Sequence, residues 1–391
     1  MPSLPDHTLD ARAPVQMMDT EGAAAPLTDG VGLCLSGGGY RAMVFHLGVL
    51  WRLFDAGVLL DLKRISSVSG GSIAAALLAL KWPKLAAAGA GRAVFEAEVA
   101  VPLRAMAGTS VDVMAGIKGL LLPGRISDKV ADAYDKQLFH GATLQDLPDE
   151  PRFVINATNV QSGALWRFSK PYMRDYRVGE VRAPRVALAR AVAASSAFPP
   201  FLSPFQMDLD PAAFTPNSGT DLQHEPYTSR VLLTDGGVYD NLGLETVWKR
   251  YASVLVSDGG GAMAPEPKPA SDWAEHAYRV LDLVDNQVRA LRKRQVIGSY
   301  TARPGDAVHR TGAYWGIRTD IADYGLADAL PCPPARTTEL AAVPTRLSAL
   351  DGRVQERLVN WGFAVCDAAL RRHVLPAGAA RPDFPYPAAG V

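Results

Sequence analysis

Two neighbouring stretches of the chain share one pattern, in which a short apolar run is followed by a glycine-rich turn and a helical repeat. The first unit begins with an apolar run over 31–36 and three glycines. Apolar residues then recur at three- and four-residue spacing from Met43 to Phe54. This spacing predicts a buried strand followed by an amphipathic helix that ends near Gly57.

The second unit repeats the pattern over a shorter length. Residues 64–68 predict a strand, 69–71 a tight turn, and 72–81 an Ala/Leu-rich helix that Pro83 ends. Strand, glycine turn and helix in succession, twice over, are typical of a mainly parallel sheet.

The rest of the chain is less regular. Further strands are predicted over 153–160, 165–168, 231–234 and 252–256. Helical patterns cover 273–297 and 346–374, and residues 84–150 are helical but irregular. A surface loop is expected over 208–227, and the Pro/Gly-rich residues 304–345 predict no clear element.

Together these elements predict an α/β fold with three layers, in which a mainly parallel central sheet is flanked by helices. No linker separates two domains. We expect a polar N-terminal arm over 1–30, an α/β domain over 31–265, and a mostly helical C-terminal extension over 266–391 that packs on the same domain.

Composition narrows the classes of partner. The 391 residues include 40 Lys and Arg against 40 Asp and Glu, so the net charge is zero. General nucleic-acid binding needs a basic surface, so no nucleic-acid partner is expected. The 48% of hydrophobic and 20% of charged residues are values of a globular protein and exclude a disordered polyelectrolyte.

Cysteine usage and the N-terminal residues bear on the compartment. Cys34, Cys332 and Cys366 are odd in number and far apart, without a CxxC or Cys/His cluster, which disfavours a zinc site and a disulfide framework. No signal peptide is recognised in the first 30 residues, and no apolar stretch reaches the roughly 18 residues of a transmembrane helix. We expect a cytoplasmic protein, and a peripheral membrane contact stays open.

The glycine run Gly37, Gly38 and Gly39 lies between a strand and a helix start, where bare N–H groups and the helix dipole favour an anion. The interpretations are a dinucleotide site, a phosphate loop, an oxyanion hole for acyl transfer, and a tight turn without ligand. The spacing from Gly37 to Ala42 fits a dinucleotide site, but Asp55 falls in the predicted helix rather than after the next strand. No Gly-Lys-Ser/Thr follows, which disfavours a phosphate loop.

Ser69 is the central residue of Ser-Val-Ser-Gly-Gly over 67–71. A serine on a tight turn between a strand and a helix is the context of a nucleophile elbow. The pattern here is S-x-S-x-G, with Ser67 in place of the first glycine, and an ordinary Gly/Ser turn is the alternative. Ser66, Ser67 and Ser72 are expected to make turn and cap hydrogen bonds.

A nucleophilic serine needs a base. None of the seven histidines lies in a small-residue turn after a predicted strand, whereas two aspartates follow strands and precede two glycines. These are Asp235 and, one strand later, Asp258. Parallel strands would present such residues at the edge that holds the serine turn, and an ordinary Asp-Gly turn is the alternative for either.

Four segments combine these features in one order. They are Leu-Ser-Gly-Gly-Gly-Tyr-Arg-Ala over 35–42, Ser-Val-Ser-Gly-Gly over 67–71, Ala-Ser-Ser-Ala-Phe-Pro-Pro-Phe over 194–201 and Asp-Gly-Gly-Val-Tyr-Asp-Asn-Leu-Gly over 235–243. In this combination the chain resembles the patatin-like phospholipases, a family of lipid acyl hydrolases. The resemblance covers roughly residues 30–260 and assigns no function to the C-terminal third.

The resemblance implies a Ser–Asp dyad without a catalytic histidine. Ser69 would be the nucleophile and Asp235 the base, because the longer motif surrounds Asp235 and not Asp258. Arg41 matches the basic position after the glycines and would steady that loop or attract an anionic head group. The implied oxyanion donors are the amides of Gly37, Gly38 and Gly39.

The expected function is therefore hydrolysis of acyl ester bonds in phospholipids or other lipid esters, through an acyl-serine intermediate. The resemblance implies neither cofactor nor metal, and residues 31–265 would form the catalytic domain. The apolar segment 114–122 is a candidate lid or membrane contact. A catalytically silent binding or regulatory module of the same fold and a Rossmann-type nucleotide-binding protein are the alternatives.

Overall fold

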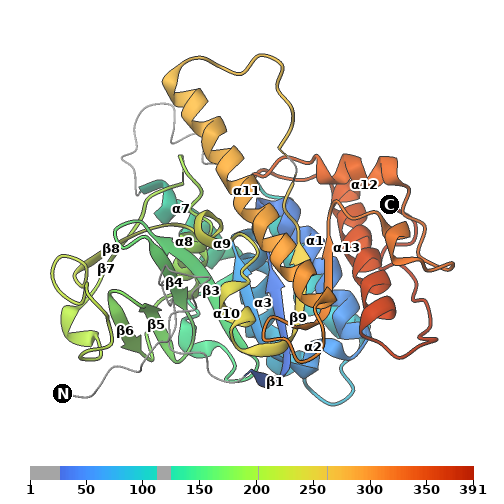
Figure 1. Cartoon of the computed structure of the whole chain (residues 1–391), viewed down its shortest axis with the longest axis horizontal. Helices are drawn as coiled ribbons and strands as arrows, with labels where there is room; N and C mark the ends of the chain where they lie inside the picture. The colour runs from blue at the N-terminus through green and yellow to red at the C-terminus, as the bar shows by residue number, and fades with distance from the viewer. Residues whose placement is uncertain (1–26, 112–124, 201, 262) are drawn as a thin grey trace.

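The computed structural model describes residues 27–111, 125–200, 202–261 and 263–391 (Figure 1). Most of the predicted N-terminal arm and the apolar segment 114–122 lie outside the described residues. The described strands are β1 Thr28–Leu35, β2 Leu62–Val68, β3 Arg152–Asn159, β4 Ala164–Phe168, β5 Tyr172–Asp175, β6 Gly179–Arg182, β7 Phe205–Asp208, β8 Arg230–Asp235, β9 Tyr251–Asp258 and β10 Thr311–Gly316.

The described helices include two long ones near the C-terminus and several short ones between strands. They are α1 Gly39–Asp55, α2 Val58–Asp61, α3 Gly70–Leu85, α4 Arg92–Phe95, α5 Val101–Ala107, α7 Arg125–Tyr134, α8 Leu188–Ser195, α9 Gly237–Asp240, α10 Glu245–Trp248, α11 Trp273–Thr301, α12 Pro334–Ala341 and α13 Gly352–His373. None of these helices is both long and apolar enough to cross a membrane.

One sheet joins all the described strands. Its order is β10-β9-β1-β2-β3-β4-β5-β6, and β8 pairs with β3 and with β7. The strands from β10 to β3 are parallel, and those beyond β3 are antiparallel. The parallel core flanked by helices confirms the predicted α/β fold class.

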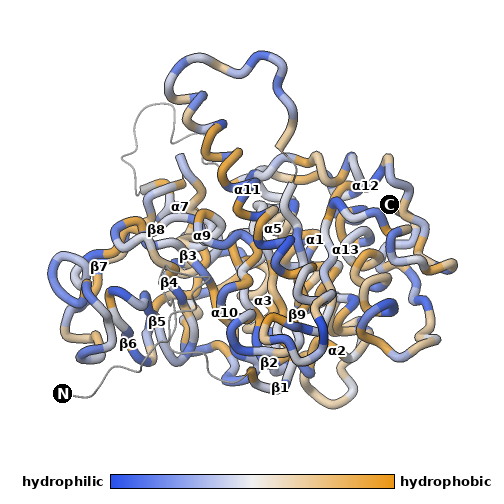
Figure 2. The backbone as a smooth tube through the Cα atoms, viewed as in Figure 1, coloured by the Kyte–Doolittle hydropathy of each residue, from blue (hydrophilic) through white to orange (hydrophobic). Residues whose placement is uncertain are grey.

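Alternate residues of the central strands face two separate hydrophobic clusters. In β1, Leu33 and Leu35 belong to the larger cluster with α1, α3 and α13, whereas Cys34 belongs to the smaller one. In β9, Leu255 and Val256 divide in the same way. Because side chains alternate across a strand, this division shows helices on both faces and hence three layers. Figure 2 colours the backbone of these elements by hydropathy.

Helices α1 and α13 cross at very close range. A Cβ added to Gly48 of α1 would lie 1.9 Å from the carbonyl oxygen of Val359, and one added to Gly362 of α13 would lie 2.0 Å from that of Phe45. Only glycine permits such an approach of two backbones. The contact buries α1 almost completely between the sheet and the C-terminal helix (Figure 1).

Three details differ from the sequence predictions. Pro83 lies inside α3, which ends two residues later at Leu85, so the lost hydrogen bond and any kink affect only the last turn of the helix. The last helix begins at Gly352 rather than at residue 346. Asp351 caps it there, because its side chain accepts hydrogen bonds from two backbone N–H groups of the first turn. Strand β10 arises in the segment that predicted no element.

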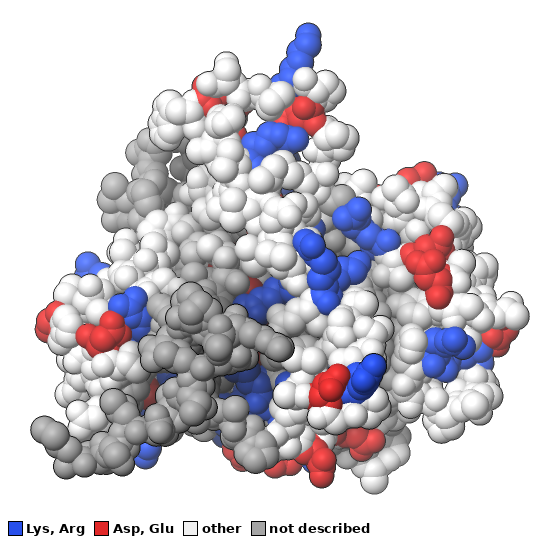
Figure 3. Space-filling model, viewed as in Figure 1, with Lys and Arg blue, Asp and Glu red and all other residues white. Residues whose placement is uncertain are grey.

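Charged side chains are mixed on the visible face of the molecule. Figure 3 shows blue basic and red acidic groups scattered among large neutral areas. This distribution agrees with the zero net charge of the sequence.

Candidate active site

Strands β2 and β8 end against each other on the same edge of β3. Val68, the last residue of β2, pairs with Asn156 in parallel register. Asp235, the last residue of β8, pairs with Ala157, the next residue of β3, in antiparallel register. Parallel neighbours are expected from the sequence, but the two strands run towards each other. The head-to-head ends bring Ser69 and Asp235 together across 166 positions of sequence.

Ser69 follows β2 in a strained conformation. Its φ of 50° and ψ of −121° are unfavourable for a residue with a Cβ. The next residue touches the glycine loop, since a Cβ added to Gly70 would lie 2.1 Å from the carbonyl oxygen of Gly39. This close packing of two turns holds the serine at the strand end, which is the arrangement of a nucleophile elbow.

A chain of hydroxyl groups supports this turn from behind. The Ser69 N–H donates to Ser195 Oγ at 2.9 Å, and Ser195 Oγ lies 2.9 Å from Ser72 Oγ. Ser72 in turn donates to Ser67 Oγ at 3.0 Å. All four serines are buried, so these bonds fix the strained backbone in a site that water does not loosen. Ser67 and Ser72 thus support the turn through bonds between side chains, and neither of them caps helix α3.

The Ser69 side chain lies beside the carboxylate of Asp235 and favours its charged form. The same carboxylate accepts the Gly237 N–H at 2.7 Å, and it is almost fully buried. Burial raises the pKa of Asp235 to about 7, while the hydrogen bond from the Gly237 N–H and the neighbouring Ser69 side chain oppose the rise. A carboxylate with a pKa near neutrality can both accept and return a proton at physiological pH.

The glycine loop lies beside Ser69, but its three amides are not equivalent. The Gly37 N–H donates to both the carbonyl and the side-chain oxygen of Asn241, at 3.1 and 3.0 Å. Within the described residues, no hydrogen bond is recorded for the N–H groups of Gly38 and Gly39. Gly39 begins helix α1, whose dipole adds to their preference for a negative charge.

Arg41 is buried and ties this loop to distant parts of the chain. Its guanidinium donates to the carbonyls of Gly259 at 3.3 Å and Val343 at 2.5 Å. Its Nη2 has no recorded partner in the described structure and lies 3.2 Å from where a Cβ on Gly38 would be. Burial lowers the pKa of Arg41 to about 10, so it remains charged at neutral pH. The geometry fits a group that steadies the glycine loop.

The competing candidates lie elsewhere. Asp258 ends β9, where it accepts hydrogen bonds from the Gly260 N–H and the Tyr314 hydroxyl. Asp55 is the last residue of α1, 3.7 Å from Arg92, and not at a strand end where a ribose could meet it. His46 is buried beneath the glycine loop, with its ring nitrogens near Ser36 O and Ser257 Oγ. Burial lowers the pKa of His46 to about 4, so it is neutral.

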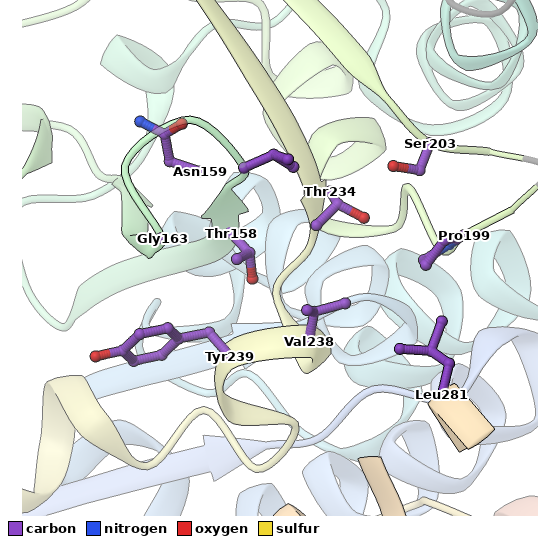
Figure 4. Close-up of a pocket in the computed structure, with 10 residues that line it drawn as sticks. Thr158, Asn159, Gly163, Pro199, Ser203, Thr234, Val238, Tyr239 and Leu281 are labelled. Carbon is purple, nitrogen blue, oxygen red and sulfur yellow. The ribbon is translucent and has the colours of Figure 1, made fainter. Parts of the chain in front are cut away.

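A pocket of about 460 Å³ opens beside the end of β8. Thr234 and Val238, which flank the Asp235 turn, form one wall, and Leu281 of α11 closes another (Figure 4). Its other lining residues are Thr158, Asn159, Val160, Gly163, Pro199, Ser203 and Tyr239. Most of its exposed lining is apolar, so it suits a hydrocarbon group better than a charged one.

Three residues near the site have no predicted role. Ser195 and Asn241 lie in segments that carry the family resemblance, so their positions could have drawn attention even though their contacts could not be deduced. Asp285 lies in α11, in the C-terminal third, and no sequence signal marks it. The described residues hold no cluster of His, Cys, Asp and Glu side chains suited to a metal ion.

Comparison with known protein families assigns the sequence of this chain to one of them. A family model described as patatin-like phospholipase matches residues 33–248, which is more than half of the chain. The comparison with curated protein sequences finds no match. The match includes the glycine loop, the Ser69 turn and Asp235, but not α11 or the helices after it.

A solved structure shows the same fold at low sequence identity, and two further structures align less well. Human GIVD cytosolic phospholipase A2 aligns with a TM-score of 0.50 and 15% identity, covering 88% of this chain and 61% of that one. The same enzyme in complex with methyl gamma-linolenyl fluorophosphonate gives 0.47 and 16%, covering 87% and 57%. VipD from Legionella pneumophila gives 0.36 and 14%, covering 90% and 68%. By the family match, and with a fold in agreement, the chain belongs to the patatin-like phospholipases.

Proposed function

We propose that this protein is a serine lipid acyl hydrolase that uses Ser69 as nucleophile and Asp235 as base. The observation that carries the proposal is the meeting of the two at the ends of β2 and β8, where the serine lies on a strained turn and the carboxylate is buried with its pKa raised to about 7. Family membership supports a lipid ester as substrate. The apolar pocket beside the Asp235 turn supports an acyl chain within that substrate.

The first step would form an acyl-serine. Deprotonated Asp235 accepts the Ser69 proton while Ser69 Oγ attacks the ester carbonyl carbon. The carbonyl oxygen gains the negative charge, which the N–H groups of Gly38 and Gly39 are placed to hold. As the intermediate collapses, the carbon–oxygen bond to the alcohol breaks, and protonated Asp235 gives its proton to the departing oxygen.

The second step would release the fatty acid. A water molecule gives a proton to Asp235 and attacks the acyl carbon, and the same two amides hold the negative oxygen. Collapse breaks the bond to Ser69 Oγ, which regains the proton from Asp235. In this scheme Gly37 anchors the loop through Asn241, and Arg41 holds it from the other side.

Hydrolysis of a phospholipid and of a short soluble ester tests the proposal. Because Asp235 acts only when deprotonated, kcat/KM should rise with pH, with a midpoint near its pKa of about 7, and then level off. Release of fatty acid would be followed by titration and that of the soluble ester by absorbance. No hydrolysis of either ester at pH 8, with or without detergent, would contradict the proposal and favour the silent binding module.

A further inference from the structure

Helix α11 lies beyond the matched family region, yet it reaches the site through Asp285. The Nδ2 of Asn241 lies 3.4 Å from both carboxylate oxygens of Asp285. On its other side, Asn241 Oδ1 accepts the Gly37 N–H at 3.0 Å. A continuous path of hydrogen bonds therefore runs from α11 to the glycine loop.

The amide of Asn241 is wedged between the two catalytic turns. A Cβ added to Gly237 would lie 3.3 Å from its Cγ, and one added to Gly37 would lie 3.0 Å from its Oδ1 and 3.2 Å from the Cβ of Ser69. An asparagine amide can turn over and exchange its donor and acceptor ends. A carboxylate only accepts, so Asp285 directs the NH₂ end towards itself and the oxygen towards Gly37.

Asp285 also acts on Asp235 through charge. It is mostly buried, and the repulsion between the two carboxylates contributes to the raised pKa of Asp235. Burial raises the pKa of Asp285 itself, and Asp282 and Asp258 add to the rise, whereas Arg289 one turn along the helix and the Asn241 amide favour the charged form.

The other groups that face Asp235 are uncharged. They are Ser69 at the elbow and the hydroxyl of Tyr134 in α7. Burial raises the pKa of Tyr134, so its hydroxyl is neutral at physiological pH. Asp285 is therefore the charged group of the described structure that bears on the base.

We propose that Asp285 is a positioning residue for the acyl-transfer site: its carboxylate orients Asn241 against the glycine loop and sets the charge that the catalytic base experiences. The inference rests on the proposed Ser69–Asp235 dyad. It assigns a role in the reaction to the C-terminal region.

Two substitutions separate the two effects. Asp285→Asn keeps an oxygen that accepts a hydrogen bond from Asn241 but removes the charge. The midpoint of the rise of kcat/KM with pH, the acid limb, should therefore move about half a unit to one unit lower in pH, while kcat stays nearly the same. Asp285→Ala removes both, so the same shift should come with a kcat lower by about three- to tenfold. Glu275→Gln, which removes an exposed charge from the same helix, is the control and should leave the pH dependence in place.

A stability cycle tests the same coupling without any assay of activity. Unfolding free energies of the wild type, Asp235→Asn, Asp285→Asn and the double variant would be measured at pH 8 and pH 4. At pH 8 the stabilisation by Asp235→Asn should be smaller when Asp285 is already neutral, and at pH 4 the two changes should add.

Additive stabilities at pH 8, or an acid limb unmoved by Asp285→Asn in an active enzyme, would overturn the inference while leaving the dyad intact. A wild-type protein without activity would instead contradict the proposed catalytic role of the Ser69–Asp235 dyad. The cycle would then still decide whether Asp285 and Asp235 are coupled.

Discussion

Replacing Ser69 with alanine is expected to lower kcat for ester hydrolysis by about 10³-fold or more, to near background. The variant keeps the backbone amides of Gly38 and Gly39 but has no atom that can form the acyl intermediate. Its affinity for lipid should change little, because only one oxygen is removed. The loss would be measured as fatty acid released from phospholipid vesicles and as turnover of a soluble ester.

The fold should survive this substitution. The strained turn is held by the Ser69 backbone N–H and by packing of Gly70, neither of which needs the side chain. Circular dichroism and the melting temperature would confirm that the variant is folded. Ser271→Ala, at an exposed serine, is the matched control and should keep full activity. An active Ser69→Ala variant would place the chemistry on another residue.

Asp235→Asn is expected to lower kcat by about 10²–10⁴-fold and, above pH 7, to make the protein more stable. The amide cannot take the proton from Ser69, which explains the loss of rate. It can still accept the Gly237 N–H and can donate to Ser69, so few hydrogen bonds are lost. What disappears is the free-energy cost of a buried negative charge.

The sign of the stability change follows from the pKa. Asp235 has a pKa of about 7 in the folded protein against an ordinary value of 3.8, so between these values the folded state holds a proton that the unfolded chain has released. Wild-type stability therefore falls as pH rises through this window, by up to about 4 kcal/mol in total. Asp235→Asn does not titrate and escapes this fall.

Measuring the stability of Asp235→Asn and of the wild type at several pH values needs no further control variant, because the two proteins should differ only where Asp235 is charged. Denaturant unfolding should show the variant and the wild type nearly equal at pH 4, with the variant's advantage growing until about pH 7 and then constant. A variant that is less stable at pH 8, or a difference that does not depend on pH, would contradict the buried, raised-pKa carboxylate on which the mechanism depends.

The elements around the serine could be predicted because local pattern and tertiary structure agree there. The predicted strands over 31–36 and 64–68 and the helices after them match β1, β2, α1 and α3 within a few residues. In each, a buried run, a glycine turn and an apolar repeat all point to the same element. The apolar runs over 231–234 and 252–256 likewise match most of β8 and β9.

The direction of β8 could not be read in the same way. An apolar run ending in Asp-Gly-Gly looks the same whether it runs parallel or antiparallel to its neighbour. The pairing is decided by β3, which continues past the end of β2 and leaves Ala157–Asn159 free for another strand. For the same reason pattern alone could not separate Asp235 from Asp258.

The contacts that refine the site depend on long-range packing. The Gly37 N–H already donates to Asn241, a residue 204 positions away in sequence that the fold brings next to it. The three glycines therefore look alike in sequence but differ in whether their N–H groups donate a hydrogen bond within the described structure. Asp285 meets the site because α11 crosses in front of the sheet (Figure 1). The periodicity of the sequence predicts helix α11, but it does not predict which face of that helix lies against Asn241.

The most direct test of the central claim is the intact mass of the protein after exposure to a fluorophosphonate, for the wild type and for Ser69→Ala. An activated serine displaces fluoride and gains one phosphonyl group, whereas an ordinary hydroxyl does not react. We predict a single adduct on the wild type, mapped to Ser69, and none on the variant. No adduct on the wild type, even with detergent or liposomes present, or an equal adduct on both proteins, would contradict an activated Ser69.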